Sequence, residues 1–263
     1  MRVRGLGKVL LVVCGGAALS CASASPSART VQLPPEVRAD DPLAPTILMQ
    51  QGEALVREGR IEEGRARLQA ALQLQPTNPT IHNQLGLAEM AAGRPAQAID
   101  HFTRALQLAP TFSDARNNRG AAYMQLGQYS QAEADFLQAL GDRYYPNRAG
   151  VYFNLGSLHV LKGSLVAAEE NLRRAAVPTG PIEAFLLLGE VEERLGKLEL
   201  AESALRDGIS RAPERTDLLL ALAAFLERRG RAREARAYYE KVVALAPYSQ
   251  EAEQARLRLK AGS

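Results

Sequence analysis

The sequence from Ser113 to Ala139, SDARNNRGAAYMQLGQYSQAEADFLQA, determines the fold. Its apolar and small residues recur at helical spacing on both sides of Leu126-Gly127-Gln128, which predicts two helices joined by a tight turn. Gly120 and Ala132 are small enough to let two helix backbones approach closely. A single hairpin of this size cannot bury its apolar faces alone, so copies of it are expected on both sides.

The copies are found at regular intervals along the chain. Turn glycines recur at intervals of 34, 34, 36, 33 and 34 residues, as Gly59, Gly93, Gly127, Gly163, Gly196 and Gly230. A small residue of the first helix keeps the same period, as Gly52, Gly86, Gly120, Gly156, Gly189 and Ala223. The second helix repeats an apolar residue, as Leu68, Phe102, Phe136, Leu172, Leu205 and Tyr239. This pattern resembles the tetratricopeptide repeat family, which implies an all-α superhelical solenoid of about six repeats with a C-terminal capping helix.

The repeat boundaries follow from this period and from prolines that close most units. We expect a solenoid over residues 46–263, with repeats at 46–78, 79–112, 113–148, 149–181, 182–215 and 216–247 and a capping helix at 248–260. Residues 1–20 read as a lipoprotein signal peptide. Residues 21–45 are rich in Pro, Ser and Ala and predict a disordered tether.

Charge argues against nucleic acid as a partner. The formal net charge is +3, and Arg2, Arg4 and Lys8 supply three positive charges within the predicted signal peptide. The remaining 29 basic residues balance the 29 acidic residues (32 − 3 = 29 against 29).

Two processing sites compete at the end of the signal peptide. Ala18-Leu19-Ser20-Cys21 resembles a bacterial lipobox, in which lipid is attached to the cysteine, here Cys21. Residue 22 is Ala rather than Asp, which in that lipoprotein class implies an anchor in the outer membrane, facing the periplasm. Cleavage after Ala24, in Ala22-Ser23-Ala24, would instead release a soluble protein.

The joint between the third and fourth repeats carries a more specific resemblance. Residues 141–148 insert two residues, and Tyr145-Pro146-Asn147-Arg148 is followed by Asn154-Leu155-Gly156. Together with the pair Asn117-Asn118, this resembles the PilF/PilW-type lipoproteins of type IV pilus biogenesis, which are outer-membrane pilotins. Arg119 departs from that family's pattern.

The resemblance implies a non-enzymatic pilotin. Such a protein binds the type IV pilus secretin subunit and promotes its outer-membrane localisation and multimerisation, and so supports pilus assembly and pilus-dependent motility. The alternative is a generic periplasmic scaffold for envelope assembly or cell-wall enzymes. We expect the free protein to be monomeric.

A stacked-hairpin solenoid offers its partner a groove lined by the first helices. Counting from the glycine of each first helix predicts a groove that begins rich in amides and becomes apolar, formed by Asn83, Met90, Asn117, Asn118, Met124, Phe153, Asn154, Val160 and Leu186. It would take an amphipathic helix or an extended peptide. Phe153, Val160 and Leu186 fit a core between repeats equally well.

Nothing in the sequence predicts catalysis. His82, His101 and His159 occupy positions that packing explains, and no motif for a metal, cofactor or nucleophile is present. The acid pairs Glu169-Glu170 and Glu192-Glu193 read as solvated helix faces. We therefore expect no enzyme activity, cofactor, metal or small-molecule substrate.

Overall fold

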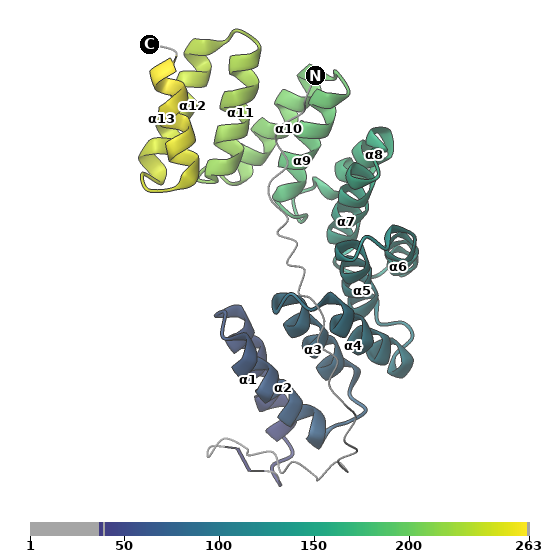
Figure 1. The fold of residues 1–263 in the computed structure, drawn as a ribbon. Helices are drawn as coiled ribbons and strands as arrows, with labels where there is room; N and C mark the ends of the chain where they lie inside the picture. The colour runs from purple at the N-terminus through teal and green to yellow at the C-terminus, as the bar shows by residue number, and fades with distance from the viewer. Residues whose placement is uncertain (1–36, 39, 262–263) are drawn as a thin grey trace, which may run out of the picture. The chain divides into compact units, whose positions relative to one another are not determined.

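The computed structural model describes residues 37–38 and 40–261, which belong to one compact unit, Leu33–Ser263. The predicted signal peptide 1–20, Cys21 and most of the predicted tether lie outside the described residues. The described part is all-α and contains no strand (Figure 1). Its helices are α1 (Ala44–Arg57), α2 (Ile61–Leu74), α3 (Pro79–Ala91), α4 (Pro95–Leu108), α5 (Ser113–Gln125), α6 (Tyr129–Gly141), α7 (Arg148–Leu161), α8 (Leu165–Ala175), α9 (Glu183–Arg194), α10 (Leu198–Arg211), α11 (Thr216–Arg228), α12 (Ala232–Leu245) and α13 (Gln250–Ala261). None of them is long and apolar enough to cross a membrane.

The first helix begins earlier than the repeat pattern suggested. Ala44 and Pro45, the last two residues of the predicted tether, form the first turn of α1. Proline suits this position, since its fixed φ is helical and its missing N–H would have no partner there. Asp41 also accepts a hydrogen bond from the backbone N–H of Leu43 at 2.8 Å, which shapes the chain just before the helix.

Each pair of helices forms a hairpin whose geometry depends on two small residues. The turn glycines all have positive φ, between 71° and 79°, a conformation that side chains with a Cβ rarely adopt. Within the third hairpin, a Cβ added to Gly120 would lie 2.7 Å from Cε1 of Phe136. The second-helix aromatic therefore fills the space that the first-helix glycine leaves, and the predicted hairpin is confirmed.

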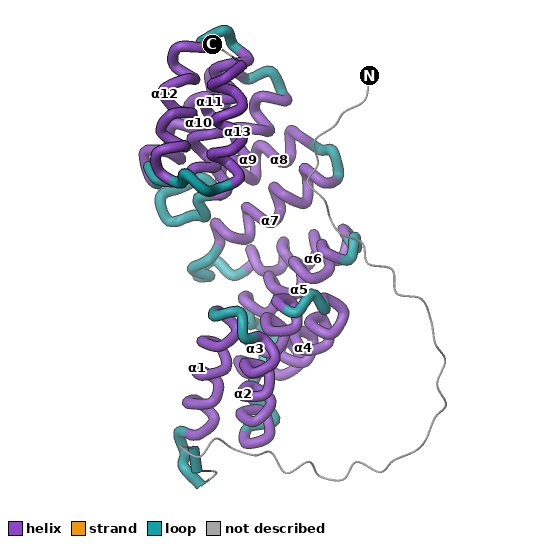
Figure 2. Tube along the Cα trace, turned by 60° about the vertical axis from the view of Figure 1, so that its left-hand side comes forward, coloured by secondary structure: helices purple, strands orange, loops and turns teal. Residues whose placement is uncertain are grey.

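The hairpins stack in chain order. Each second helix packs on the first helix of the next hairpin, and α1 contacts α3, α3 contacts α5, α5 contacts α7 and α7 contacts α9. Figure 2 shows α3, α5 and α7 following one another along the array. Buried side chains cross the boundaries between units; Phe136 of α6 shares a cluster with Val151 and Leu158 of α7. Buried side chains thus link neighbouring hairpins, and an all-α solenoid is confirmed.

The insertion between α6 and α7 is a fixed joint rather than a loose turn. Tyr145 is only 5% exposed, and its hydroxyl donates to Asp114 Oδ1 at 2.7 Å. Arg148 donates to the carbonyl oxygens of Leu140 and Asp142, each at 2.7 Å. Burial, reinforced by Asp114, raises the pKa of the Tyr145 phenol far above its usual value. The two extra residues are accommodated because Tyr145 fills space in the core of the third and fourth repeats.

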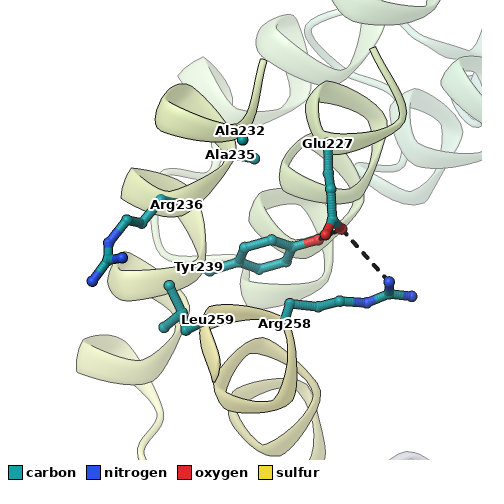
Figure 3. Close-up of a pocket in the computed structure, with 7 residues that line it drawn as sticks. All are labelled: Glu227, Ala232, Ala235, Arg236, Tyr239, Arg258 and Leu259. Carbon is teal, nitrogen blue, oxygen red and sulfur yellow. Dashed lines mark hydrogen bonds and ion pairs between the residues drawn. The ribbon is translucent and has the colours of Figure 1, made fainter. Parts of the chain in front are cut away.

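The predicted capping helix is α13, which covers the last hairpin. Figure 3 shows Tyr239 of α12 reaching toward Glu227 of α11, with Arg258 of α13 beside the same carboxylate. The Tyr239 hydroxyl donates to Glu227 Oε2 at 2.8 Å, and Arg258 lies 3.7 Å from that oxygen. Burial first, and the Glu227 carboxylate second, raise the pKa of Tyr239 to about 12. The cap is therefore joined to the hairpin by the ion pair of Arg258 with Glu227 as well as by the buried methyls of Ala252 and Ala255.

Candidate interaction surface

The first helices of successive hairpins present equivalent positions on one side of the array. We number each position from the small residue of its first helix: Gly52, Gly86, Gly120, Gly156, Gly189 or Ala223. Positions −3, −2, +1, +4 and +5 share one side of an α-helix. We call the surface formed by these positions of α1, α3, α5, α7, α9 and α11 the inner face.

The middle of the inner face carries a row of hydrogen-bonded amides. Asn118 Nδ2 on α5 donates to Asn83 Oδ1 on α3 at 3.0 Å, and Asn154 Nδ2 on α7 donates to Asn117 Oδ1 on α5 at 2.9 Å. In both bonds position −2 donates to position −3 of the preceding repeat. Asn83 and Asn117 are only 5% and 7% exposed, which leaves little of either amide for a partner. These two predicted groove residues therefore serve mainly to join repeats two to four, while Asn118 and Asn154 stay half-buried.

Replacing Asn118 tests this row. We expect Asn118→Ala to lower the free energy of unfolding by about 1–2 kcal/mol, because Asn83 Oδ1 is then buried without its donor. Asn118→Asp keeps the shape of the side chain but places a carboxylate, which can only accept, against the acceptor Asn83 Oδ1. We therefore expect Asn118→Asp to lower the free energy of unfolding by more than Asn118→Ala does. Urea unfolding followed by circular dichroism measures both, and equal losses for the two variants would contradict the proposed donor role of Asn118.

The apolar residues of the predicted groove are all half-buried. Met90 and Met124 pack against the clusters around Phe102 and Phe136, while Phe153, Val160 and Leu186 pack against clusters further along the array. Each of them therefore supports the core with one side and keeps part of its surface outward. They lie on four helices, α3, α5, α7 and α9, and do not converge on one pocket. Their role in partner binding remains a prediction.

Two cavities lie on the inner face, one toward each end of the array. The larger, of about 390 Å³, lies between α9, α11 and α13 and is lined by Leu186, Leu220, Ala221, Ala224, Glu190 and Glu251, among others. The other, of about 350 Å³, is lined by Glu53, Val56, Arg57, Leu68, Gln84 and Leu87 of the first two repeats. An apolar floor with charged groups around it suits a peptide side chain or an amphipathic helix.

Of the nine predicted groove residues, only Leu186 lines either cavity. The prediction concentrated on repeats two to four, where the amide row occupies the inner face. Glu190 and Ala224 stand at position +1 and Ala221 at position −2, so extending the count to these positions in the last two repeats would have found them.

Arg119, which departs from the pilotin pattern, belongs to an ion pair between helices. Its guanidinium donates to both carboxylate oxygens of Asp135, at 2.7 and 2.8 Å, and to Thr103 Oγ1 at 3.2 Å. Asp135 is 4% exposed. Hydrogen bonding to Asp135 raises the pKa of Arg119 above its usual value. Arg119 thus links α5 to α6 and α4.

The prediction of solvated faces for the two acid pairs was wrong for one member of each. Glu169 is 6% and Glu192 is 2% exposed, whereas Glu170 is exposed. Arg173 bridges the two buried acids, donating to Glu169 Oε1 at 2.9 Å and to Glu192 Oε1 at 2.7 Å. The helical period placed these acids on helix faces but could not show that a neighbouring hairpin covers those faces.

Two of the three histidines form a pair within the second hairpin, in which His82 is buried and His101 is half-buried. Nδ1 of His82 on α3 lies 3.4 Å from Nδ1 of His101 on α4, and the ring centroids are 5.7 Å apart. Burial is the main reason that the pKa of each imidazole falls below its usual value; Arg104 adds to this at His82 and Arg65 at His101. Glu89 and Asp100 oppose it at His101, and the carbonyl of Pro76 opposes it at His82. Packing explains both side chains, and no described group of three or more His, Cys, Asp and Glu residues could hold a metal ion.

The histidine pair predicts a loss of stability in mild acid. The folded-state pKa values lie below the unfolded value of about 6.5, so the unfolded chain binds more protons as the pH falls. Stability is therefore complete above about pH 6.5 and declines below it until the folded histidines also protonate. Urea midpoints across this range should fall with pH in the native protein and fall less when both His82 and His101 are replaced by Gln. The same slope in both proteins would contradict the assignment.

A family model described as tetratricopeptide repeat matches residues 49–113, 117–181 and 186–250, and a second matches residues 89–140. The chain belongs to the tetratricopeptide repeat family. Members of this fold are typically scaffolds for protein interaction rather than enzymes. Among curated proteins, none matches this chain.

Solved structures similar to this tetratricopeptide repeat protein include PilF, PilW and YrrB. PilF of Pseudomonas aeruginosa is 20% identical with a TM-score of 0.68, and the match covers 84% of this chain and 98% of PilF. PilW, described as a widely conserved type IV pilus biogenesis factor, is 24% identical with a TM-score of 0.69, covering 80% of this chain and 97% of PilW. YrrB, described as having an unusual peptide-binding site, is 18% identical with a TM-score of 0.52, covering 72% of this chain and 97% of YrrB. Identities at this level show a shared fold.

Proposed function

We propose that this tetratricopeptide repeat protein is a pilotin, which binds the type IV pilus secretin subunit and promotes its placement and multimerisation in the outer membrane. The observation that carries the proposal is the extent of the structural match: it covers 98% of PilF and 97% of PilW, so this chain shares the fold of each along almost its whole length. The sequence before the array adds support, since Cys21 stands at the end of a lipobox-like segment.

The inner face supplies the surface for such binding. The 390 Å³ cavity joins an apolar floor, formed by residues such as Leu220 and Ala224, to a rim that carries Glu190 and Glu251. Glu193 on the same rim is already paired with Arg228, which donates to it at 2.7 and 2.9 Å. Burying an apolar secretin segment over this floor would provide the binding energy, and no chemical step is needed.

Binding of purified secretin subunit to the detergent-solubilised full chain tests the proposal. Phe153→Glu and Leu186→Glu place a charge on half-buried apolar surface of the inner face, and Glu190→Lys reverses an exposed charge at the cavity rim. We expect each to weaken binding about tenfold or more. Leu137→Glu is the matched control, because Leu137 lies on α6 and is 56% exposed, so it should bind as the native protein does.

Urea midpoints of the same variants separate binding from folding. If Phe153→Glu loses stability together with binding, Phe153 belongs to the core, and the exposed Glu190→Lys variant still tests the inner face. If the native chain does not bind secretin but retains cell-wall enzymes or envelope-assembly factors, the scaffold alternative replaces the pilotin proposal.

Membrane attachment through Cys21 is tested separately. Lipid on Cys21 would give the full chain a stable anchor in the inner leaflet of the outer membrane, facing the periplasm. Cys21→Ala should therefore leave the protein folded and release it from outer-membrane fractions. Attachment that persists in this variant would contradict the anchor and favour another means of association.

A further inference from the structure

The two cavities of the inner face differ in charge. Four acids and one base line the larger cavity, between α9, α11 and α13: Glu190, Glu193, Asp217, Glu251 and Arg228. The cavity of the first two repeats is lined by one acid and one base, Glu53 and Arg57. The volume of the larger cavity, about 390 Å³, is typical of a ligand pocket. Only the larger cavity therefore combines this volume with an excess of acidic groups.

Two of the four acids are already paired with arginines. Glu193 accepts hydrogen bonds from Arg228 at 2.7 and 2.9 Å. Asp217 accepts hydrogen bonds from Arg215 at 2.6 and 3.0 Å, and Arg215 is also shared with Glu183 at 2.9 Å. Both arginines next to the cavity are thus engaged and have no charge to spare for the other two acids.

Glu190 and Glu251 are the remaining acids, and both can be reached from outside. Glu190 is exposed and Glu251 is half-buried, and neither forms an ion pair with a described residue. They come from α9 and α13, the two outer helices of the three that form the cavity. The cavity therefore offers an incoming partner one accessible carboxylate on each of these two helices.

The other bases of these three helices and of their ends do not compensate for Glu190 and Glu251. They lie outside the lining and are Arg258, Arg256, Arg229, Arg194 and Lys260. The first three, in that order, are engaged with the Glu227 carboxylate, the Pro247 carbonyl oxygen and the Phe225 ring. The last two are exposed to water, where salt screens their charge. The excess of two acids at the cavity therefore remains.

The floor of the cavity fits one side of a helix. Leu186, Leu220, Ala221 and Ala224 are half-buried, so each keeps part of its apolar surface outward. Among the described residues that line the cavity, only Gln254 has a side-chain amide. An extended peptide would need partners for its backbone N–H and C=O groups, whereas a helix bonds most of these groups internally. The lining therefore favours a helix over an extended peptide.

We propose that this cavity binds an amphipathic helix of a partner protein, whose apolar residues cover Leu186, Leu220 and Ala224 and whose flanking lysines or arginines pair with Glu190 and Glu251. In the pilotin this helix belongs to the secretin subunit, and that identity rests on the proposed function. The two carboxylates provide selectivity, because an acidic helix would be repelled and a neutral one would cover them without a partner.

Two designed peptides test the charge of the partner. Both form a helix with leucines at i, i+3, i+4 and i+7, and the positions beside the leucines carry lysine in one peptide and glutamate in the other. Fluorescence anisotropy with the full chain in an uncharged detergent measures binding. We expect the lysine peptide to bind saturably and at least about tenfold more tightly than the glutamate peptide. No saturation with the lysine peptide, or an affinity no higher than that of the glutamate peptide, would overturn the proposal.

Two double variants locate the basic residues of the bound helix. Glu190→Gln with Glu251→Gln keeps the shape of both side chains and removes their charges, so the affinity for the lysine peptide should fall about tenfold. Glu199→Gln with Glu253→Gln is the matched control, because these two acids are exposed, lie outside the lining and form no ion pair with a described residue. The control should bind as the native protein does, and urea midpoints verify that both variants are folded. Equal affinities of the two double variants would contradict the assignment.

Secretin binding separates this site from the proposed function. We expect the purified secretin subunit to bind the native chain and to bind the Glu190→Gln, Glu251→Gln variant about tenfold more weakly. If secretin binds both proteins alike, this cavity is not its docking site, and the pilotin proposal stands. If the lysine peptide depends on the two carboxylates but secretin does not bind the native chain, the pilotin proposal fails, and the cavity remains a site for a basic helix of another partner.

Discussion

Phe136→Ala is expected to lower the free energy of unfolding by about 3–5 kcal/mol, as large-to-small changes of buried aromatics do. The Phe136 side chain is fully buried on α6 and occupies the space above Gly120 on α5. It also belongs to the cluster that joins the third repeat to Val151 and Leu158 of the fourth. Its removal would therefore loosen one hairpin and the contact between two units, and could separate the unfolding of the two ends of the array.

Two controls make this prediction specific. Leu137→Ala changes the next residue of α6, which is 56% exposed, and should shift stability by only about 0.5 kcal/mol or less. Phe136→Leu should cost less than Phe136→Ala, because repeats one, four and five hold Leu68, Leu172 and Leu205 at this position. Urea unfolding followed by circular dichroism measures all three. A cost for Phe136→Ala as small as that of Leu137→Ala would contradict the packing described.

Asp135→Ala should cost about 3 kcal/mol, although it removes few packing contacts. The substitution leaves the Arg119 guanidinium, whose side chain is 20% exposed, without the carboxylate that binds it at 2.7 and 2.8 Å. Removing one partner of a buried ion pair leaves the other charge unpaired in the protein interior, which solvates a charge poorly. Urea midpoints measure the loss, and the double variant Arg119→Met with Asp135→Leu should recover much of it, because apolar side chains need no partner there.

The matched control for this pair is Arg236–Glu240 on α12. Both side chains are more than half exposed, at 57% and 56%, and their separation of 2.9 Å resembles that of the buried pair. Glu240→Ala should cost about 0.5 kcal/mol or less, because water solvates the remaining arginine. Similar losses for Asp135→Ala and Glu240→Ala would mean that burial does not strengthen the dependence of Arg119 on its partner.

The period of the sequence was sufficient to predict the hairpins. A turn glycine, and a small residue opposite a large one, are determined by contacts within a single hairpin. The roles of Gly127, Gly120 and Phe136 could therefore be predicted without knowledge of the neighbouring repeat. The boundary of α1 was less certain, since Pro45 fits both a tether and the first turn of a helix.

The pairing of side chains between repeats could not be predicted in the same way. The residue that faces Asn83 depends on the offset between stacked hairpins. If α5 were shifted along α3, a side chain other than Asn118 would face the amide of Asn83. The burial of Glu192 depends on the same offset, because Arg173, which holds it, comes from the preceding hairpin. Tyr145 was visible as part of an insertion, but its burial follows from space that only the packed core defines.

The amide row also bears on how such an array can gain or lose units during evolution. Recombination between similar repeats deletes one period, and the surviving neighbours must then fit together. Loss of the third unit would set α7 beside α3, where Asn154 could donate to Asn83 as it now donates to Asn117. Loss of the fourth would set Leu187 of α9 against the buried amide of Asn117, which would lose its donor. The units therefore share a period without being interchangeable, and a copy-number change is tolerated better on this face at the third repeat than at the fourth.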